Sequence, residues 1–191
     1  MKTTRLVSGM LVGTCIATLF AGLSQAQTKA GGAPPAQAKA KAAAPAATMP
    51  NLAQVMRGIL YPNSNVIFWA QSQDPAKDVK PEKDAATAVN PLANAYGKWE
   101  AVENSSLALV EATRLLTVPG RKCQNGRPVP MGNADWPKFV AGLRAAGMTA
   151  YRAAQSKNQD KILDAAEVVT TACSNCHDKY RETATLQDRC K

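Results

Sequence analysis

The fold follows from one stretch near the end of the chain, DKILDAAEVVTTACSNCHDKYR (residues 160–181). Its apolar residues recur at helical spacing, which predicts a helix that begins near Asp160 and buries one face. That face carries Ile162, Ala165, Ala166 and Val169 and leads directly to Cys173 and Cys176. Residues three and four positions apart lie on one side of a helix. The two thiols and the imidazole of His177 are therefore expected on one side of this helix.

The residues Cys173-Ser174-Asn175-Cys176-His177 have the C-x-x-C-H spacing of covalent haem attachment. In such a site, the two cysteines form thioether bonds to the haem and the histidine binds the iron. We therefore predict one haem c, attached at Cys173 and Cys176, with His177 as an axial ligand of the iron. His177 is the only histidine in the sequence, which excludes a second histidine as the other axial ligand within one chain.

Three other chemistries use closely spaced cysteines. A redox-active dithiol normally lies at the start of a helix that follows a strand, where a thiol pKa is lowered. Here the pair lies near the end of a long helix. A structural zinc site would recruit Cys123 or Cys190 beside the motif residues. A disulfide between Cys173 and Cys176 would strain a regular helix.

Two further helices are predicted in the first half of the domain. The first begins near Asn51, and Pro62 is expected to break or end it. Its apolar stripe consists of Leu52, Val55, Met56, Ile59 and Leu60, and residues 66–69 continue as an apolar patch. After a charged loop at residues 74–83, the second helix is expected from about Pro91 to Thr117. Its buried face consists of Leu92, Ala95, Tyr96, Trp99, Val102, Leu109, Val110 and Leu116.

A loop rich in Gly, Asn and Pro at residues 120–134 leads to a third helix. Asp135 is the expected N-cap of that helix, and Pro137 falls in the first turn, where its missing N–H does no harm. Its buried face consists of Trp136, Phe139, Val140, Leu143, Ala150 and Tyr151. No segment alternates apolar and polar residues over a strand's length, so the expected fold class is all-α.

The first 48 residues differ in composition from the rest. Residues 1–26 have a basic start, an apolar stretch and a small-x-small ending at Ala26, which predicts a cleaved signal peptide. An uncleaved anchor is the alternative, because the apolar stretch approaches the length of a membrane span. Residues 27–48 are mostly Ala, Pro, Gln, Gly and Lys, which predicts a disordered tether. Residues 49–191 have a size typical of one domain.

The charge and the cysteine count fit an exported protein. The full chain has a net charge of +9, and loss of Lys2 and Arg5 with the signal peptide leaves +7. Such a charge suits an acidic partner or an anionic membrane face, with solubility as the alternative, and export argues against nucleic acid. Besides the motif, the predicted mature chain retains Cys123 and Cys190. An even number of cysteines in an oxidising compartment makes these two a candidate disulfide, with two free thiols as the alternative.

The residues from Cys173 to Arg181 resemble the haem motif of the cytochrome c prime group, the class II c-type cytochromes. In both, an aromatic and a basic residue follow the haem histidine at three and four positions, here Tyr180 and Arg181, and the motif lies near the C-terminus. The resemblance implies an antiparallel four-helix bundle with covalent haem near the C-terminal end of the last helix. It also implies that Tyr180 and Arg181 lie beside the haem, the alternatives being a core tyrosine and a solvated arginine.

The same resemblance implies a side chain from the first helix over the distal face of the iron, and Met56 is the candidate. A bound Met56 sulfur would make the haem six-coordinate and suited to electron transfer. A Met56 that only fills space would leave a five-coordinate iron open to nitric oxide or carbon monoxide, and a Met on an apolar stripe is often a core residue. The bundle topology would also bring Cys123 and Cys190 to one end. The tether, Pro62 and these two cysteines depart from the family pattern.

The leading hypothesis is a periplasmic, non-enzymatic carrier of one electron with a redox partner protein. The alternative is a five-coordinate haem protein that binds or senses a small gas. A third hypothesis is a zinc- or disulfide-stapled helical protein that binds a partner. The resemblance leaves a homodimer open.

Overall fold

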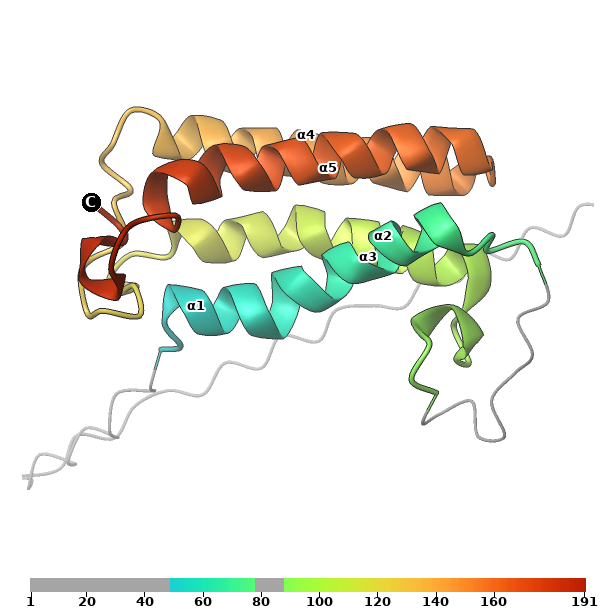
Figure 1. Ribbon diagram of the computed structural model, residues 1–191, viewed down its shortest axis with the longest axis horizontal. Coiled ribbons are helices and arrows are strands. Elements are labelled where there is room, and N and C mark those ends of the chain that lie inside the picture. The colour runs from blue at the N-terminus through green and yellow to red at the C-terminus, as the bar shows by residue number, and fades with distance from the viewer. Residues whose placement is uncertain (1–48, 78–87) are drawn as a thin grey trace, which may run out of the picture. The chain divides into compact units, whose positions relative to one another are not determined.

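The computed structural model describes residues 49–77 and 88–191 (Figure 1). Within these ranges the regular elements are helices, apart from one antiparallel bridge between Lys122 and Pro128, and the predicted all-α class is confirmed. The predicted signal peptide (1–26) and tether (27–48) lie outside the described residues, as does most of the predicted loop at 74–83. None of the described helices combines the length and the hydrophobicity that crossing a bilayer requires.

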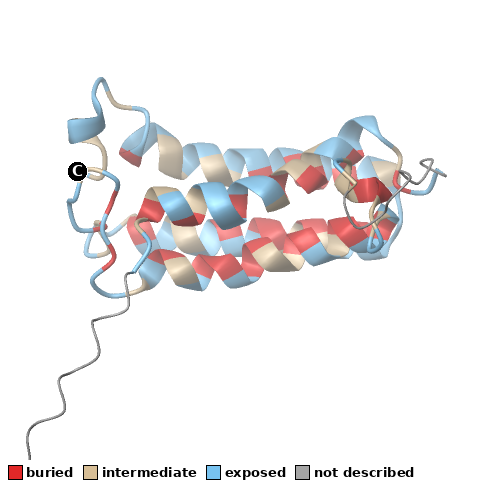
Figure 2. Cartoon of the chain, turned by 90° about the horizontal axis from the view of Figure 1, so that it is seen from below, coloured by how far each residue is buried: buried red, intermediate tan, exposed pale blue. Residues whose placement is uncertain are grey.

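Four long helical segments of the described chain lie beside one another around one apolar core (Figure 1). They are α1 and α2 (Leu52–Val55 and Tyr61–Ser72, joined by the π-helical turn η1 at Met56–Leu60), α3 (Lys98–Ala112), α4 (Trp136–Gln155) and α5 (Gln159–Tyr180). The most extensive contacts join α3 to α4, α4 to α5, and α2 to both α3 and α5. Buried residues therefore gather along the facing sides of the helices (Figure 2).

Helix α5 buries the residues that its periodicity predicts. Ile162, Ala165, Ala166 and Val169 are each 1% exposed or less. The helix begins after Asn158, whose side-chain oxygen accepts a hydrogen bond from the Lys161 N–H at 3.0 Å. It then continues without interruption through the C-x-x-C-H motif to Tyr180. The motif therefore lies on a regular helix whose preceding turns are anchored in the core.

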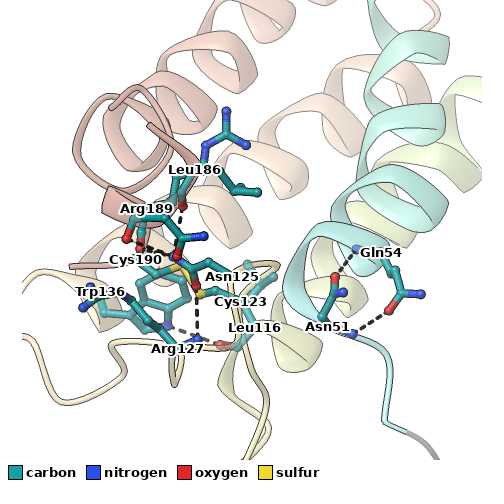
Figure 3. Close-up of a disulfide and its surroundings, with 11 residues drawn as sticks. Asn51, Gln54, Leu116, Cys123, Asn125, Arg127, Trp136, Leu186, Arg189 and Cys190 are labelled. Carbon is teal, nitrogen blue, oxygen red and sulfur yellow. Dashed lines mark hydrogen bonds between the residues drawn. A yellow bond between two sulfur atoms is a disulfide. The ribbon is translucent and has the colours of Figure 1, made fainter. Parts of the chain in front are cut away.

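The start of α1 is fixed to a distant loop. Asn51 and Gln54 form a capping box, in which each side chain accepts a hydrogen bond from the other residue's N–H at 2.9 and 2.8 Å (Figure 3). The next N–H, of Leu52, donates to the Lys122 carbonyl at 2.8 Å. The first helix is thus tied to the loop that carries Cys123.

Pro62 was predicted to break or end the first helix; the helical path does not end there, but the regular α-helix is interrupted just before it. The chain forms the π-helical turn just before it, in which the Tyr61 N–H donates to the Met56 carbonyl. Pro62 then falls in the first turn of α2, where its missing N–H is tolerated. The wider turn moves Ile59 off the buried face, to 36% exposed, although the apolar stripe predicted it in the core. The Asn63 side chain donates to the Ile59 carbonyl at 2.7 Å.

The helix predicted from Pro91 to Thr117 is interrupted near its start. A short 3₁₀ turn, η2 (Pro91–Ala93), precedes an irregular segment, and α3 begins only at Lys98. A Cβ on Gly97 would lie 2.3 Å from the Leu92 carbonyl oxygen, so the close chain path there requires glycine. As a result Tyr96 is 70% exposed, although periodicity placed it on the buried face. From Trp99 onward the predicted face is buried, and a second 3₁₀ turn, η3 (Thr113–Thr117), ends the segment.

Helix α4 begins at Trp136 with Pro137 in its first turn, as predicted. Trp136, Leu143 and Ala150 are buried, whereas Phe139, Val140 and Tyr151 are only partly so. Phe139 and Val140 keep some exposure because they border a cavity.

Candidate cofactor-binding site

A cavity of about 600 Å³ lies where α5 ends and α4 begins. Its volume is within the range of pockets that bind cofactors and other small molecules. All six residues that the sequence placed at the site line it, namely Met56, Cys173, Cys176, His177, Tyr180 and Arg181. The apolar remainder of the lining comes from every helical segment and includes Leu60, Phe68, Leu109, Leu116, Trp136, Phe139, Val140 and Leu143. The structure therefore brings the predicted residues together in one largely apolar cavity.

Cys173, Cys176 and His177 reach the cavity from one side of α5. Each is partly buried, and both cysteines pack against the apolar core. The thiols of Cys173 and Cys176 are free, so the alternative of a disulfide between them is contradicted. Two unpaired thiols and one imidazole thus share a wall of the cavity, and the spacing of the helix keeps them together.

Burial controls the protonation of these groups. It raises the pKa of the Cys173 thiol, and it raises the pKa of Cys176 to about 11, with a further contribution from neighbouring Cys173. Burial, together with the nearby Arg181 guanidinium, lowers the pKa of His177. The thiols are therefore protonated and the imidazole is neutral at pH 7. A redox-active dithiol needs the opposite shift, toward a thiolate, so the electrostatics disfavour that alternative.

Cys123 and Cys190 form a disulfide that closes one side of the cavity (Figure 3). The pairing joins the loop before α4 to the C-terminal tail. The Asn125 side chain donates to the carbonyls of Leu186 and Arg189, at 3.0 and 2.9 Å. The Cys190 N–H donates to the Tyr180 carbonyl at 3.0 Å. The tail is therefore held against the end of the domain by a covalent bond and several hydrogen bonds.

The same disulfide bears on the zinc alternative. Cys123 and Cys190 are bonded to each other, so neither can join Cys173, Cys176 and His177 as a thiolate ligand of a zinc ion. Within residues 49–77 and 88–191, no three His, Cys, Asp or Glu side chains converge as a site for a metal ion.

Asp135 links the start of α4 to the end of α5. It is the N-cap residue of α4, as predicted, but its side chain makes no capping hydrogen bond. Its carboxylate instead accepts a hydrogen bond from the Tyr180 hydroxyl at 2.6 Å and forms an ion pair with Lys179. Lys179 and then Tyr180, as hydrogen-bond donors, lower the pKa of Asp135. The charged carboxylate thus binds residues two and three positions beyond His177.

Tyr180 is a buried part of the cavity wall. It is 4% exposed, and its ring contacts those of Trp136 and Phe139 edge-on, with centroids 5.2 and 6.3 Å away. Its hydroxyl also accepts a hydrogen bond from the Asn133 side chain at 3.1 Å. Burial and the hydrogen bond to Asp135 raise the pKa of Tyr180, so the hydroxyl stays protonated and keeps donating.

We expect Tyr180→Phe to lower the free energy of unfolding by about 1 kcal/mol, because the ring contacts remain while the Asp135 carboxylate loses its neutral donor. Urea unfolding followed by circular dichroism measures the change. Tyr96→Phe is the matched control, since Tyr96 is 70% exposed, and it should change stability by less than about 0.5 kcal/mol. Equal effects of the two substitutions would contradict a structural role for the Tyr180 hydroxyl.

Met56 and Arg181 lie at the cavity in different settings. Met56 begins the π-helical turn, is partly buried and packs against the core. Such turns are rare in helices and are often found at functional sites. Arg181 is exposed, and its guanidinium donates from Nε to the Glu182 carboxylate at 2.6 Å. Met56 therefore lines the cavity from the first helix, whereas Arg181 lines it as an exposed residue in an ion pair with Glu182.

Sequence reasoning missed Arg57, Phe68 and Arg189, which also line the cavity. Phe68 belongs to the apolar patch that was recognised only as helical. No local sequence pattern marks Arg57 and Arg189. Each lines the cavity because segments that are distant in the sequence pack together in the fold.

No protein-family model, curated protein or solved structure matches this chain.

Proposed function

We propose that this protein is an exported c-type cytochrome that carries one covalent haem and transfers one electron at a time. One observation carries the proposal: two free thiols and an imidazole at C-x-x-C-H spacing line a cofactor-sized cavity with aromatic and aliphatic walls. Bound there, haem iron would exchange one electron between its ferric and ferrous states.

The residues that line the cavity fit a covalently bound haem. Cys173 and Cys176 have no disulfide partner and are available for two thioether bonds. His177 would supply the axial nitrogen to the iron from the same helix. A volume of about 600 Å³ with walls from all the helices matches a large, flat, mainly apolar cofactor.

The surrounding side chains have roles of their own. Trp136, Phe139 and Phe68 provide apolar surface that excludes water from the cavity. The bond from Tyr180 to Asp135 fixes the end of α5 against the start of α4, one turn beyond His177. The motif is therefore held on a rigid element, as a site that must keep its geometry requires.

For the fold we propose a cytochrome c prime-like, antiparallel four-helix bundle with the haem near the C-terminal end of α5. The packing of α3 on α4, α4 on α5, and α2 on both α3 and α5 supports this arrangement. For the location we propose the periplasm, reached through the predicted signal peptide. The disulfide between Cys123 and Cys190 supports an oxidising compartment. A redox partner with an acidic surface would suit the basic chain.

Mass spectrometry of the native exported protein tests the function. The expected result is a polypeptide that begins at Gln27, carries the mass of one haem and keeps it after denaturation. An optical spectrum of the same sample should show reversible reduction. A colourless protein of unmodified mass would overturn the proposal.

Gas binding is the second candidate, and Met56 decides between the two. In an electron carrier Met56 would be the sixth iron ligand, and Met56→Leu is expected to convert a low-spin spectrum to a high-spin one and abolish the sulfur-to-iron charge-transfer band. Leucine has a similar volume, so the core should tolerate it. Met131→Leu is the matched control, because Met131 packs on the core but does not line the cavity. A wild-type spectrum that is already high-spin and shifts with carbon monoxide would favour gas binding instead.

A further inference from the structure

The side chain of Arg189 is an unexplained charge in the wall of the cavity. Arg189 follows the short 3₁₀ turn η4 (Leu186–Asp188) in the C-terminal tail, and its side chain lines the cavity. Its Nε atom is buried and has no hydrogen-bond partner. Within residues 49–77 and 88–191, no carboxylate lies within ion-pair distance of its guanidinium.

Three other basic residues near the C-terminus have acidic partners, and Arg57 on the cavity wall donates to the Gln124 side chain. Lys179 pairs with Asp135, Arg181 with Glu182, and Lys191 with Asp188. These pairs are solvent-exposed to a large degree, whereas Arg189 is partly buried. A buried donor of a charged group without a partner costs free energy, and a guanidinium is satisfied best by a carboxylate that accepts two parallel hydrogen bonds. The partner of Arg189 is therefore expected to come from the occupant of the cavity.

The backbone on both sides of Arg189 is held in place. The Arg189 carbonyl accepts a hydrogen bond from the Asn125 side chain at 2.9 Å (Figure 3). The next residue, Cys190, is bonded to Cys123 and donates its N–H to the Tyr180 carbonyl. The backbone that carries the Arg189 side chain is thus fixed beside the cavity before any ligand binds, which reduces the entropy lost on binding.

We propose that Arg189 binds a carboxylate of the ligand in the cavity and that the Cys123–Cys190 disulfide holds it there. The assignment rests on the proposed function, in which that carboxylate is a haem propionate. The planar guanidinium fork matches this group, whereas the point charge of a lysine would match it only in part.

Resonance Raman spectroscopy of the haem-bearing protein tests the assignment, because the propionate bending band responds to hydrogen bonds on the carboxylate. Arg189→Gln is expected to shift that band and to lower the midpoint potential, since a positive charge near the iron is lost. Arg189→Lys should shift the band but largely preserve the potential. Arg152→Gln is the control on the far part of α4, where Arg152 is exposed, and should change neither.

Mass spectra of the same preparations distinguish a failure of the proposed haem binding from a failure of the proposed role of Arg189. Wild-type protein without haem would overturn the proposed function and this assignment with it. Haem-bearing Arg189→Gln with an unmoved propionate band would overturn the role of Arg189 and leave the proposed function intact. If Arg189→Gln does not fold, Arg189→Lys carries the test, and an unmoved band in that variant would overturn the role equally.

Discussion

The double variant Cys173→Ser/Cys176→Ser is expected to be exported without covalently bound haem. Serine keeps the size of each side chain but cannot form a thioether, so haem that enters the cavity would be held by His177 and packing alone. Denaturation should then release it completely. Haem staining after a denaturing gel, with mass spectrometry of the mature chain, measures the loss, which should be total in this variant.

A matched control lies in the same chain. Cys123→Ser/Cys190→Ser removes two other cysteines that line the cavity and should keep the full complement of haem. Each single variant, Cys173→Ser or Cys176→Ser, retains one thiol and should keep some attached haem. Covalently attached haem in the Cys173→Ser/Cys176→Ser variant would contradict the assignment of the two thioether positions.

The helix that carries Cys173, Cys176 and His177 could be predicted from the sequence because it is regular. From Ile162 to His177 a single helical periodicity predicts which residues lie in the core and on which side the motif lies. The residues that it places in the core are buried in the structure. The prediction failed where local geometry departs from a regular helix. The π-helical turn before Pro62 and the close chain path at Gly97 change which residues face inward, and apolar periodicity cannot detect either.

Other features depend on contacts between distant segments. Asp135 has the sequence pattern of an N-cap, yet its carboxylate binds Tyr180, because the end of α5 comes within reach. Arg189 resembles any basic residue of a polar tail, and only the disulfide and Asn125 bring it to the cavity. Pairings of this kind are set by tertiary structure, so a single sequence gives no signal for them.

We expect the Cys123–Cys190 disulfide to stabilise the described part of the chain more than any other single bond does. It closes a loop of 67 residues, and the chain-entropy model assigns such a loop about 4 kcal/mol of stabilisation. Cys123→Ser/Cys190→Ser should therefore lower the free energy of unfolding by up to about that amount. Urea unfolding of the haem-bearing protein measures it, and both single variants should lose stability to a similar extent because either one opens the same loop.

A reductant provides the control for this prediction, since it removes the bond without changing the sequence. Wild-type protein treated with reductant should lose stability like the double variant, while the double variant should not respond. The tail beyond Tyr180 should be the first part released, because Asn125 and the Cys190 N–H are its other anchors in the described chain. Proteolysis confined to residues 181–191 in the double variant would show this release. Single variants with clearly unequal losses, or a double variant as stable as wild type, would contradict a stabilising bond between Cys123 and Cys190.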